Sequence, residues 1–484
     1  MTIPAIIALA LYALSMGLIA VYSIVQLALS IRWIGSRKRL MHAQVPPAEE
    51  WPHITIQLPL FNERFVARRI IETCSRLDYP HDRMLIQVLD DSTDDTASLA
   101  SDAVQQLNEA GLRSVFIHRN HRIGFKAGAL AHGLELTADR FIAIFDADFI
   151  PPPHFLKTAL PFLLADSRNG MVQARWTHLN RSTSLLTRLQ ALALDAHFTV
   201  EQGGRNAAGY FINFNGTAGI WRREAIEQAG GWQSDTLTED LDLSYRAQLA
   251  GWKLIYLPFL EVPAELPEDM PAIRSQQFRW TKGAAECARK NSISLLRAAN
   301  LRILHKFHGI MHLANASLFL CIITAAAASV VMLPLLRENA GLQTAVGIAG
   351  GFFLPTIFFA WTFTSAYAGN PRQMGQALLL FPAFLVINLG LSLHQARAVL
   401  LGWAGRPSPF IRTPKHAGEI AGNRSYSPRQ FPPIATAEAL TGFGFFAATA
   451  WGLSSGVTAL IPFHLMLAIG FTLVSALSLW HARR

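Results

Sequence analysis

The stretch "IFDADF", residues 144–149, carries the clearest signal for the fold. It joins an apolar, strand-like run to two carboxylates, Asp146 and Asp148, which are separated by one small residue. Two carboxylates at this spacing repel each other unless a cation or a bound phosphate group shares the site. The stretch therefore predicts a strand that ends at a metal site, and a solvated turn before "PPP" (151–153) is the simpler alternative.

The composition of the chain indicates that a membrane takes up part of it. Of its 484 residues, 51% are hydrophobic and 15% charged, and the mean hydropathy is +0.26. An ordinary soluble enzyme needs less apolar surface than this. Residues 3–34 are apolar, 45–300 are mixed, and most of the rest is apolar again. We expect an N-terminal transmembrane anchor at 1–36, a cytosolic domain at 45–300 and a C-terminal membrane region at 301–484.

Charge and cysteine content argue against several classes of partner and site. The net charge is +9, but the basic residues gather near the predicted membrane ends, as in "RKR" (37–39) and "HARR" (481–484), so nucleic acid is a poor candidate partner. Cys74, Cys287 and Cys321 are scattered, which argues against a disulfide framework or a zinc site. We expect a multi-pass protein of the inner (plasma) membrane whose globular domain is cytosolic.

Basic residues also predict how the chain crosses the bilayer. The first apolar run is too long for a signal-peptide core and basic residues follow it, which predicts an uncleaved anchor with its N-terminus outside. Five more stretches approach spanning length: 313–335, 343–367, 377–400, 436–453 and 457–480. If all five crossed, the basic segment 405–418 and the C-terminus would lie outside, against the positive-inside rule.

One of the five stretches should therefore not cross. The best candidate is 377–400, because it contains four residues that are poorly suited to the bilayer core: Pro382, Asn388, His394 and Arg397. We expect this segment to lie along the membrane interface. About four C-terminal spans remain.

Strand-like and helix-like stretches alternate in the first half of the mixed segment. Strands are predicted at "HITIQLPL" (53–60), "MLIQVL" (84–89), "RSVFIHR" (113–119) and "RFIAIF" (140–145), with helices from Asn62, from Asp94 and in "KAGALAHGLEL" (126–136). This alternation predicts a parallel sheet that binds its ligand at the carboxyl ends of the strands. "PLFNE" (59–63), "DDST" (90–93) and "DADF" (146–149) lie at those ends. Neither G-x-G-x-x-G nor a P-loop occurs, which argues against a dinucleotide enzyme or an ATPase.

Two groups in this half could contact a phosphorylated ligand. Asp90 and Asp91 are candidates for a nucleotide site, and helix capping or a turn is the structural alternative. Lys126 could be a plain surface lysine. Its neighbours Gly124 and Gly128 would leave the backbone open to a phosphate, for which the ammonium group is a suitable point charge. A nucleotide sugar carries a diphosphate that needs Mg²⁺ or Mn²⁺, and such cations are bound through one or two carboxylates together with the substrate phosphates.

Two later stretches contain candidates for the reaction itself. In "LTEDLDLSYRAQLAGW" (237–252), Thr238 is a predicted helix cap, and Glu239 or Asp240 is either a first-turn acid or a general base. In "QQFRWTKG" (276–283), a helix would place Gln276, Arg279 and Trp280 on one face, beside a sugar and a diphosphate. An interfacial membrane helix with a Trp anchor is the alternative for this stretch.

The order of these motifs is more specific than any one of them. "DDST", "KAGAL", "DADF", "FNGTAGIWR", "TED" and "QQFRW" follow one another ahead of the membrane region. In this order they closely resemble the family 2 glycosyltransferases of the cellulose-synthase superfamily, particularly the cellulose-synthase-like mannan and glucan synthases. The resemblance runs from Leu58 to Trp280. "FIRTPK" (410–415) further resembles that family's gating loop, F-x-V-T-x-K, with Arg412 in place of Val.

This resemblance implies a fold, a metal and roles for named residues. The fold is the α/β nucleotide-diphospho-sugar transferase (GT-A) type with an α-helical transmembrane bundle, and the cofactor is Mg²⁺ or Mn²⁺. The implied roles are nucleotide-sugar binding by Glu63, Asp90, Asp91, Lys126 and Asp146; metal binding by Asp146 and Asp148; catalysis by Asp240 as base, with Glu239 beside it; acceptor and diphosphate binding by Gln276, Arg279 and Trp280; and a gating loop with Phe410, Thr413 and Lys415.

The predicted function is inverting transfer of a hexose to a growing β-linked polysaccharide. The donor would be UDP-glucose or GDP-mannose, the acceptor a glycan, and the lipid bilayer the surrounding medium. The sequence does not decide whether accessory subunits take part. The alternative is a lipid glycosyltransferase that adds one or a few sugars to a glycolipid-forming acceptor such as diacylglycerol. A transporter without catalysis would leave the six motifs unexplained.

Overall fold

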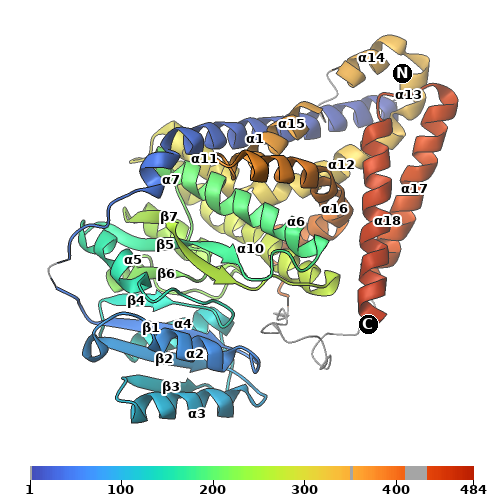
Figure 1. Ribbon diagram of the computed structural model, residues 1–484. Coiled ribbons are helices and arrows are strands. Elements are labelled where there is room, and N and C mark those ends of the chain that lie inside the picture. Colours follow the sequence, from blue (N-terminus) through green and yellow to red (C-terminus); the bar gives the residue numbers. More distant parts are fainter. Residues whose placement is uncertain (1–2, 49, 349–352, 409–432, 484) are drawn as a thin grey trace.

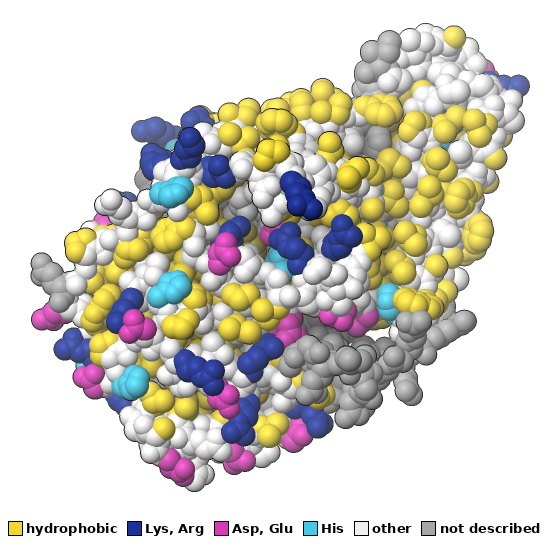
Figure 2. Space-filling view, viewed as in Figure 1, with side chains coloured by type: hydrophobic (Ala, Val, Ile, Leu, Met, Phe, Trp, Pro, Cys, Tyr) yellow, Lys and Arg dark blue, Asp and Glu magenta, His cyan; other side chains and the backbone are white. Residues whose placement is uncertain are grey.

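A seven-stranded sheet with flanking helices stands beside a group of long apolar helices (Figure 1). The computed structural model describes residues 3–48, 50–348, 353–408 and 433–483. Charged side chains gather over the sheet-containing part, and hydrophobic side chains cover much of the helical part at the upper right (Figure 2). This distribution agrees with a globular domain attached to a helical membrane bundle.

The strands are β1 (Ile54–Leu60), β2 (Met84–Asp90), β3 (Ser114–His118), β4 (Phe141–Ile144), β5 (Asn169–His178), β6 (Gly219–Arg222) and β7 (Lys253–Ala264). They form a sheet in the order β3-β2-β1-β4-β6-β5-β7. The first four strands are parallel, which confirms the alternating pattern. The sheet as a whole is mixed rather than parallel. β6 is antiparallel to β4 because it begins opposite the end of β4, where Gly219 pairs with Ile144.

Helices cover the sheet and connect it to the bundle. They are α2 (Ala67–Ser75), α3 (Thr96–Glu109), α4 (Phe125–Glu135), α5 (Phe155–Leu164), α6 (Leu185–Asp195), the π-helix η2 (Ala196–Gln202), α7 (Gly203–Ala208), α8 (Arg223–Gln228), α9 (Glu239–Leu249) and α10 (Met270–Arg297). The helix after β1 starts later than the predicted Asn62, because that residue has a left-handed φ of 55° and its side chain accepts a hydrogen bond from the Thr93 amide. The helix after β2 starts at Thr96, two residues later than predicted.

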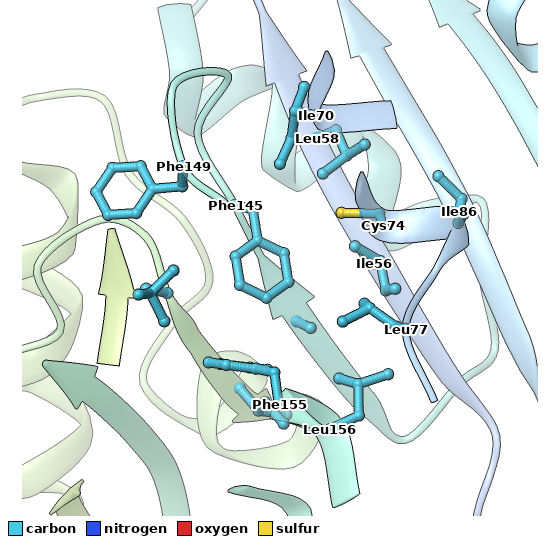
Figure 3. Close-up of a cluster of buried hydrophobic side chains, with 14 of the residues drawn as sticks. Ile56, Leu58, Ile70, Cys74, Leu77, Ile86, Phe145, Phe149, Phe155 and Leu156 are labelled. Carbon is cyan, nitrogen blue, oxygen red and sulfur yellow. The ribbon is translucent and has the colours of Figure 1, made fainter. Parts of the chain in front are cut away.

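A hydrophobic core fixes the first strands against α2 and α5. Ile56 and Leu58 of β1 are fully buried with Ile70 of α2, and Phe145 packs edge-on against Phe155 of α5 at 4.9 Å between ring centroids (Figure 3). Alternate side chains of β1 point to opposite faces, and both faces are covered. The strand ends that follow this core are therefore held in defined positions.

The bundle consists of helices from both ends of the chain. These are α1 (Ile3–Met41), α11 (Ile303–Leu313), the 3-10 helix η3 (Asn315–Ser317), α12 (Leu318–Val331), α13 (Leu333–Glu338), α14 (Ala340–Ile348), α15 (Phe353–Ser365), α16 (Pro371–Trp403), α17 (Pro433–Ser455) and α18 (Ile461–Arg483). By length and composition, three of the described helices could cross a membrane: α1, α16 and α18. A fourth span results if α11 and residues 315–331, which are bent by 53°, count as one.

The predicted interfacial segment 377–400 lies within α16. Although α16 is long and apolar enough to span, residues that flank both of its ends contact the sheet-containing domain. Just before it, the Tyr367 hydroxyl donates to Asp195 at 2.6 Å, and just after it the Arg406 carbonyl accepts from Lys282 at 2.6 Å. A crossing helix would have its ends on opposite sides of the bilayer. The interfacial placement stays a prediction that these contacts favour. The count of about four C-terminal spans also stays a prediction, and the candidate helices among the described residues differ from it, since they include α16 and leave out α17 and the stretch 343–367.

Candidate active site

A cleft opens at the carboxyl ends of β1, β2 and β4 and is closed on its other side by α9 and α10. Ten of the predicted site residues line it: Glu63, Asp91, Lys126, Asp146, Asp148, Glu239, Asp240, Gln276, Arg279 and Trp280. Asp90 is not among the lining residues. Phe410, Thr413 and Lys415 of the predicted gating loop lie outside the described residues.

The two adjacent acids at the end of β2 have different surroundings. Asp90 is fully buried behind the cleft, and its Oδ2 is 2.7 Å from Nδ1 of His118. Asp91 faces the cleft and accepts two hydrogen bonds of 2.6 Å from the Arg119 guanidinium. A bidentate pair of this kind fixes the carboxylate in one orientation. Only Asp91 is in position to contact a ligand.

Two arginines at this edge were not predicted as site residues. Arg119 holds Asp91, and Arg122 lines the cleft with its guanidinium 3.4 Å from the centre of the Phe61 ring. Burial lowers the pKa of Arg122 to about 10, and the charges of Arg119 and Arg279 act in the same direction. The stretch "HRNHR" (118–122) follows β3 directly, so the strand-end rule applied to β3 would have found both arginines.

Lys126 lies in the first turn of α4 and joins two walls of the cleft. Its Nζ donates to Asp146 at 2.5 Å and to the Gly216 carbonyl at 2.8 Å. Burial opposes the charge, but Asp146 and Glu239 outweigh it and raise the pKa of Lys126. The glycines that flank Lys126 were predicted to expose the backbone to a phosphate. The structure gives another reason for glycine at these two positions. Gly124 has a φ of +74°, and a Cβ at Gly128 would lie 2.0 Å from the Ile123 carbonyl oxygen, so the turn itself requires them.

Asp146 and Asp148 extend into the cleft from the loop after β4, as predicted. The Asp148 residue is 5% exposed, and the Asp146 side chain 34%. Seven carboxyl groups line the cleft, against two arginines and one lysine. A diphosphate would be repelled from such a cleft without added positive charge, and carboxylate oxygens are donors that hard divalent cations prefer. The donor set therefore fits Mg²⁺ or Mn²⁺.

The protein would supply only part of the coordination of that cation. No group of three or more His, Cys, Asp and Glu side chains is placed to hold a metal within the described part of the chain. Divalent cations in phosphate-binding sites are commonly held by one or two carboxylates, with substrate phosphates and water completing the shell. Asp146 and Asp148 match this arrangement.

Glu239 and Asp240 form the first turn of α9, where both face the cleft. Burial, reinforced by the charge of Glu239, raises the pKa of Asp240 to about 7, and burial also raises the pKa of Glu239. The Asp240 side chain lies over Gly216, where a Cβ would be 3.0 Å from Oδ2. A carboxyl group that titrates near neutral pH is well suited to accept a proton.

The predicted N-cap position of Thr238 is confirmed. Thr238 occupies the position before α9, but its side chain makes no capping hydrogen bond. Its Oγ1 instead lies 3.4 Å from Sγ of Cys287 on α10. Contact with α10 therefore takes the place of a local cap.

The stretch 276–283 is helical, as predicted, and belongs to α10. Gln276, Arg279 and Trp280 share the face that lines the cleft, so Trp280 is not placed as a membrane anchor. Burial lowers the pKa of Arg279, although Glu239 and Asp146 counteract that shift. The cleft thus has carboxylates held by basic side chains on its strand side, and a cation and an aromatic ring on its helix side.

Comparison of the sequence with known proteins identifies the family to which the chain belongs. Residues 52–283 match the family model described as "Glycosyltransferase like family 2". The chain is 36% identical over 429 residues to glucomannan 4-beta-mannosyltransferase 2 of Arabidopsis thaliana, covering 85% of this chain and 77% of that protein. The chain belongs to glycosyltransferase family 2, within the cellulose-synthase superfamily. This confirms the resemblance carried by the six motifs.

Two further comparisons agree with this assignment. The glycosyltransferase is 37% identical over 381 residues to glucomannan 4-beta-mannosyltransferase 1 of Oryza sativa subsp. japonica, covering 75% of this chain and 69% of that protein. Its fold is similar to that of the mannosyltransferase PcManGT from Pyrobaculum calidifontis, solved in complex with GDP-Man and Mn²⁺. That match has a TM-score of 0.51 at 22% identity and covers 79% of this chain and 98% of that one. The glycosyltransferase therefore has the predicted GT-A fold.

Proposed function

We propose that this glycosyltransferase transfers mannose from GDP-mannose to the growing end of a β-1,4-linked glycan. The observation that carries the proposal is the position of Asp240, a carboxyl group with a pKa of about 7, in the same cleft as Lys126, Arg279 and Trp280. Of the two predicted donors, GDP-mannose is favoured because relatives that match over most of the chain are named 4-beta-mannosyltransferases.

Asp240 acts as the general base in this proposal. Its carboxylate takes the proton from the attacking hydroxyl of the acceptor, and that oxygen displaces the nucleoside diphosphate from the anomeric carbon. Direct displacement with one base and no nucleophilic carboxylate inverts the configuration, so an α-linked donor gives a β-linked product. Trp280 offers a flat surface for the acceptor sugar, and Arg279 and Lys126 compensate the charge of the leaving diphosphate.

Asp146 and Asp148 are the proposed ligands of a divalent cation. When bound, Mg²⁺ or Mn²⁺ supplies Lewis-acid stabilisation of the leaving diphosphate. The excess of carboxyl groups in the cleft supports this assignment. Lys126 then keeps Asp146 oriented through its 2.5 Å ion pair.

We propose that the domain at 45–300 is cytosolic and that α16 lies along the inner interface of the plasma membrane. Three segments later in the chain contact α10 through hydrogen bonds. Lys282 donates to Ser408, which follows α16, at 2.6 Å, and Arg274 donates to Glu438 of α17 and Ser478 of α18 at 2.6 and 2.9 Å. The end of α16, the start of α17 and the end of α18 would then share one side of the bilayer. We expect a cysteine at Ser408 not to react with an impermeant thiol reagent added to intact cells, and to react once the cells are lysed.

Product analysis tests the proposed function directly. The purified full-length protein would be given labelled GDP-mannose or UDP-glucose with Mn²⁺ or Mg²⁺. We expect a precipitable polymer from GDP-mannose that an endo-β-1,4-mannanase degrades. Label that partitions into chloroform–methanol would instead support the lipid glycosyltransferase, and polymer from UDP-glucose alone would contradict the proposed donor.

A further inference from the structure

A fully buried lysine on α10 has no part in the proposed mechanism. Lys282 lies beyond Trp280, on a different face of the helix from the cleft-lining residues. Its Nζ donates to the Arg406 carbonyl and to Ser408 Oγ, both at 2.6 Å, and lies 3.3 Å from Oε1 of Glu286. The first two contacts join α10 to the chain that leaves α16, and the third lies within α10.

Glu286 continues this connection to the base. While Oε1 faces Lys282, Oε2 accepts a hydrogen bond of 2.8 Å from the backbone N–H of Leu237. Leu237 lines the cleft three residues before Asp240. The Lys282 and Glu286 side chains are only 1% and 8% exposed, so solvent screens the pair little. A continuous polar chain thus runs from the end of α16 to the segment that holds Asp240.

Packing leaves this segment little room to shift. A Cβ at Gly283 would lie 2.6 Å from both side-chain branches of Thr238, so α10 and the segment 237–240 are in close contact. Thr238 has no local capping bond, as described above. The start of α9 therefore takes its position from α10, and Glu286 makes the hydrogen bond that fixes the backbone there.

We propose that Lys282 and Glu286 are positioning residues that hold the segment 237–240 in register with the end of α16. Glu286 acts on the backbone of Leu237, and Lys282 orients Glu286 while binding the chain after α16. The inference rests on the proposed role of Asp240 as base. A buried ion pair is weak evidence for stability, since an apolar pair of similar volume is often equally stable. A displacement of about 1 Å at a reacting group can lower the rate about 10²-fold.

Two double variants distinguish the effect of the hydrogen bond between Glu286 and Leu237 from the effect of the ion pair between Lys282 and Glu286. Both K282M/E286Q and K282M/E286L remove the charges together, so neither leaves a buried charge alone. The glutamine carbonyl can still accept from Leu237, whereas leucine cannot. We expect kcat of K282M/E286L to fall about 10-fold or more, with donor Kd within about twofold of wild type. K282M/E286Q should show a smaller loss of kcat, because it keeps the bond to Leu237 and loses only the link to the chain after α16. Both would be assayed as full-length protein in membranes and after purification.

A buried ion pair elsewhere on α10 serves as the matched control. Arg274 and Glu438 are 4% and 0% exposed and join α10 to α17. We expect R274M/E438L to change thermal stability without the selective loss of kcat. If K282M/E286L does not fold, the conservative E286D keeps the charge but is one methylene too short to reach both partners, and we expect its kcat to fall with unchanged donor Kd.

Three results would overturn the inference. The first is wild-type kcat in a folded K282M/E286L or E286D protein. The second is an equal loss of kcat in K282M/E286Q and K282M/E286L. The third is that the R274M/E438L control shows the same changes of kcat, KM and thermal stability as K282M/E286L. Asp240→Asn measured alongside distinguishes the two proposals. If Asp240→Asn stays active, the base assignment fails. If it is inactive while K282M/E286L is normal, only the positioning role fails.

Discussion

The carboxylates on the two sides of the cleft, the strand side and the helix side, have different environments. On the strand side, Asp91 and Asp146 are each held by a basic side chain, Arg119 at 2.6 Å and Lys126 at 2.5 Å. On the helix side, burial raises the pKa of Glu239 and Asp240. Charges that are held in place suit the binding of a donor, and a carboxyl group that titrates near pH 7 suits proton transfer. This difference supports the proposal that the strand side binds the donor and that α9 supplies the base.

Replacing the base should cause the largest loss of rate. It should impair catalysis, the role proposed for the helix side of the cleft, and leave donor binding intact. We expect Asp240→Asn to lower kcat by about 10²- to 10⁴-fold, because a positioned base is lost, while donor affinity stays nearly normal. Single-turnover transfer and calorimetric binding of donor would measure the two quantities. Glu239→Gln is the matched control and should lose less. An equal loss of affinity and rate in Asp240→Asn would move the base elsewhere.

Removing a proposed metal ligand should impair the strand side of the cleft, where the donor and its cation are proposed to bind. Asp148→Asn is expected to abolish detectable transfer in a standard assay, with kcat/KM lower by about 10²- to 10³-fold, since a bound cation stabilises the transition state by several kcal/mol. Expression, membrane insertion and thermal stability of the full-length variant would be measured with activity. Near-normal turnover with Mg²⁺ or Mn²⁺ would refute the metal assignment, because it would mean that this carboxylate is dispensable.

Local sequence patterns predicted most of the strand half, although Arg119 and Arg122 were missed. Apolar runs that end in acids gave β1, β2 and β4 and the residues at their ends, since both the strand and its terminal carboxylate are encoded within a few positions. The antiparallel β6 could not be predicted in this way. Its direction depends on where the loop before it meets β4.

The helix half depends on contacts between residues far apart in the chain. Thr238 had the sequence of a cap, but packing against Cys287, 49 residues away, replaces the local bond. The contact between Lys282 and Ser408 spans 126 residues. Local propensity contains no information about such pairs, so the residues proposed to position Asp240 could be identified only in the structure.

Gly216 lies between the two halves and offers a smaller perturbation. Its carbonyl accepts from Lys126, and a Cβ there would lie 3.0 Å from Asp240 Oδ2 at a φ of +83°. We expect Gly216→Ala to displace Asp240 and lower kcat about 10-fold, in addition to a backbone strain of about 1–2 kcal/mol. Gly209→Ala has similar strain, with φ of +68°, but no neighbour within 4 Å. This control should lose stability and keep kcat, and equal kcat in both variants would argue against close contact at Asp240.

The pH profile gives the finest test, because it follows the titration of one group. The pKa of Asp240 is raised to about 7, so the carboxyl group is protonated and inactive as a base below that pH. We expect kcat/KM, which reports the free enzyme, to fall about tenfold per pH unit below about pH 7 and to reach a plateau above it. The charge of Glu239 contributes to the raised pKa, after burial. Glu239→Gln should therefore move the acidic limb to lower pH, whatever it does to the height of the plateau. Residual transfer by Asp240→Asn should lack this limb, since the titrating group is gone. A limb that stays in place in Glu239→Gln, or that persists in Asp240→Asn, would belong to another group and would remove the chemical distinction between the two halves of the cleft.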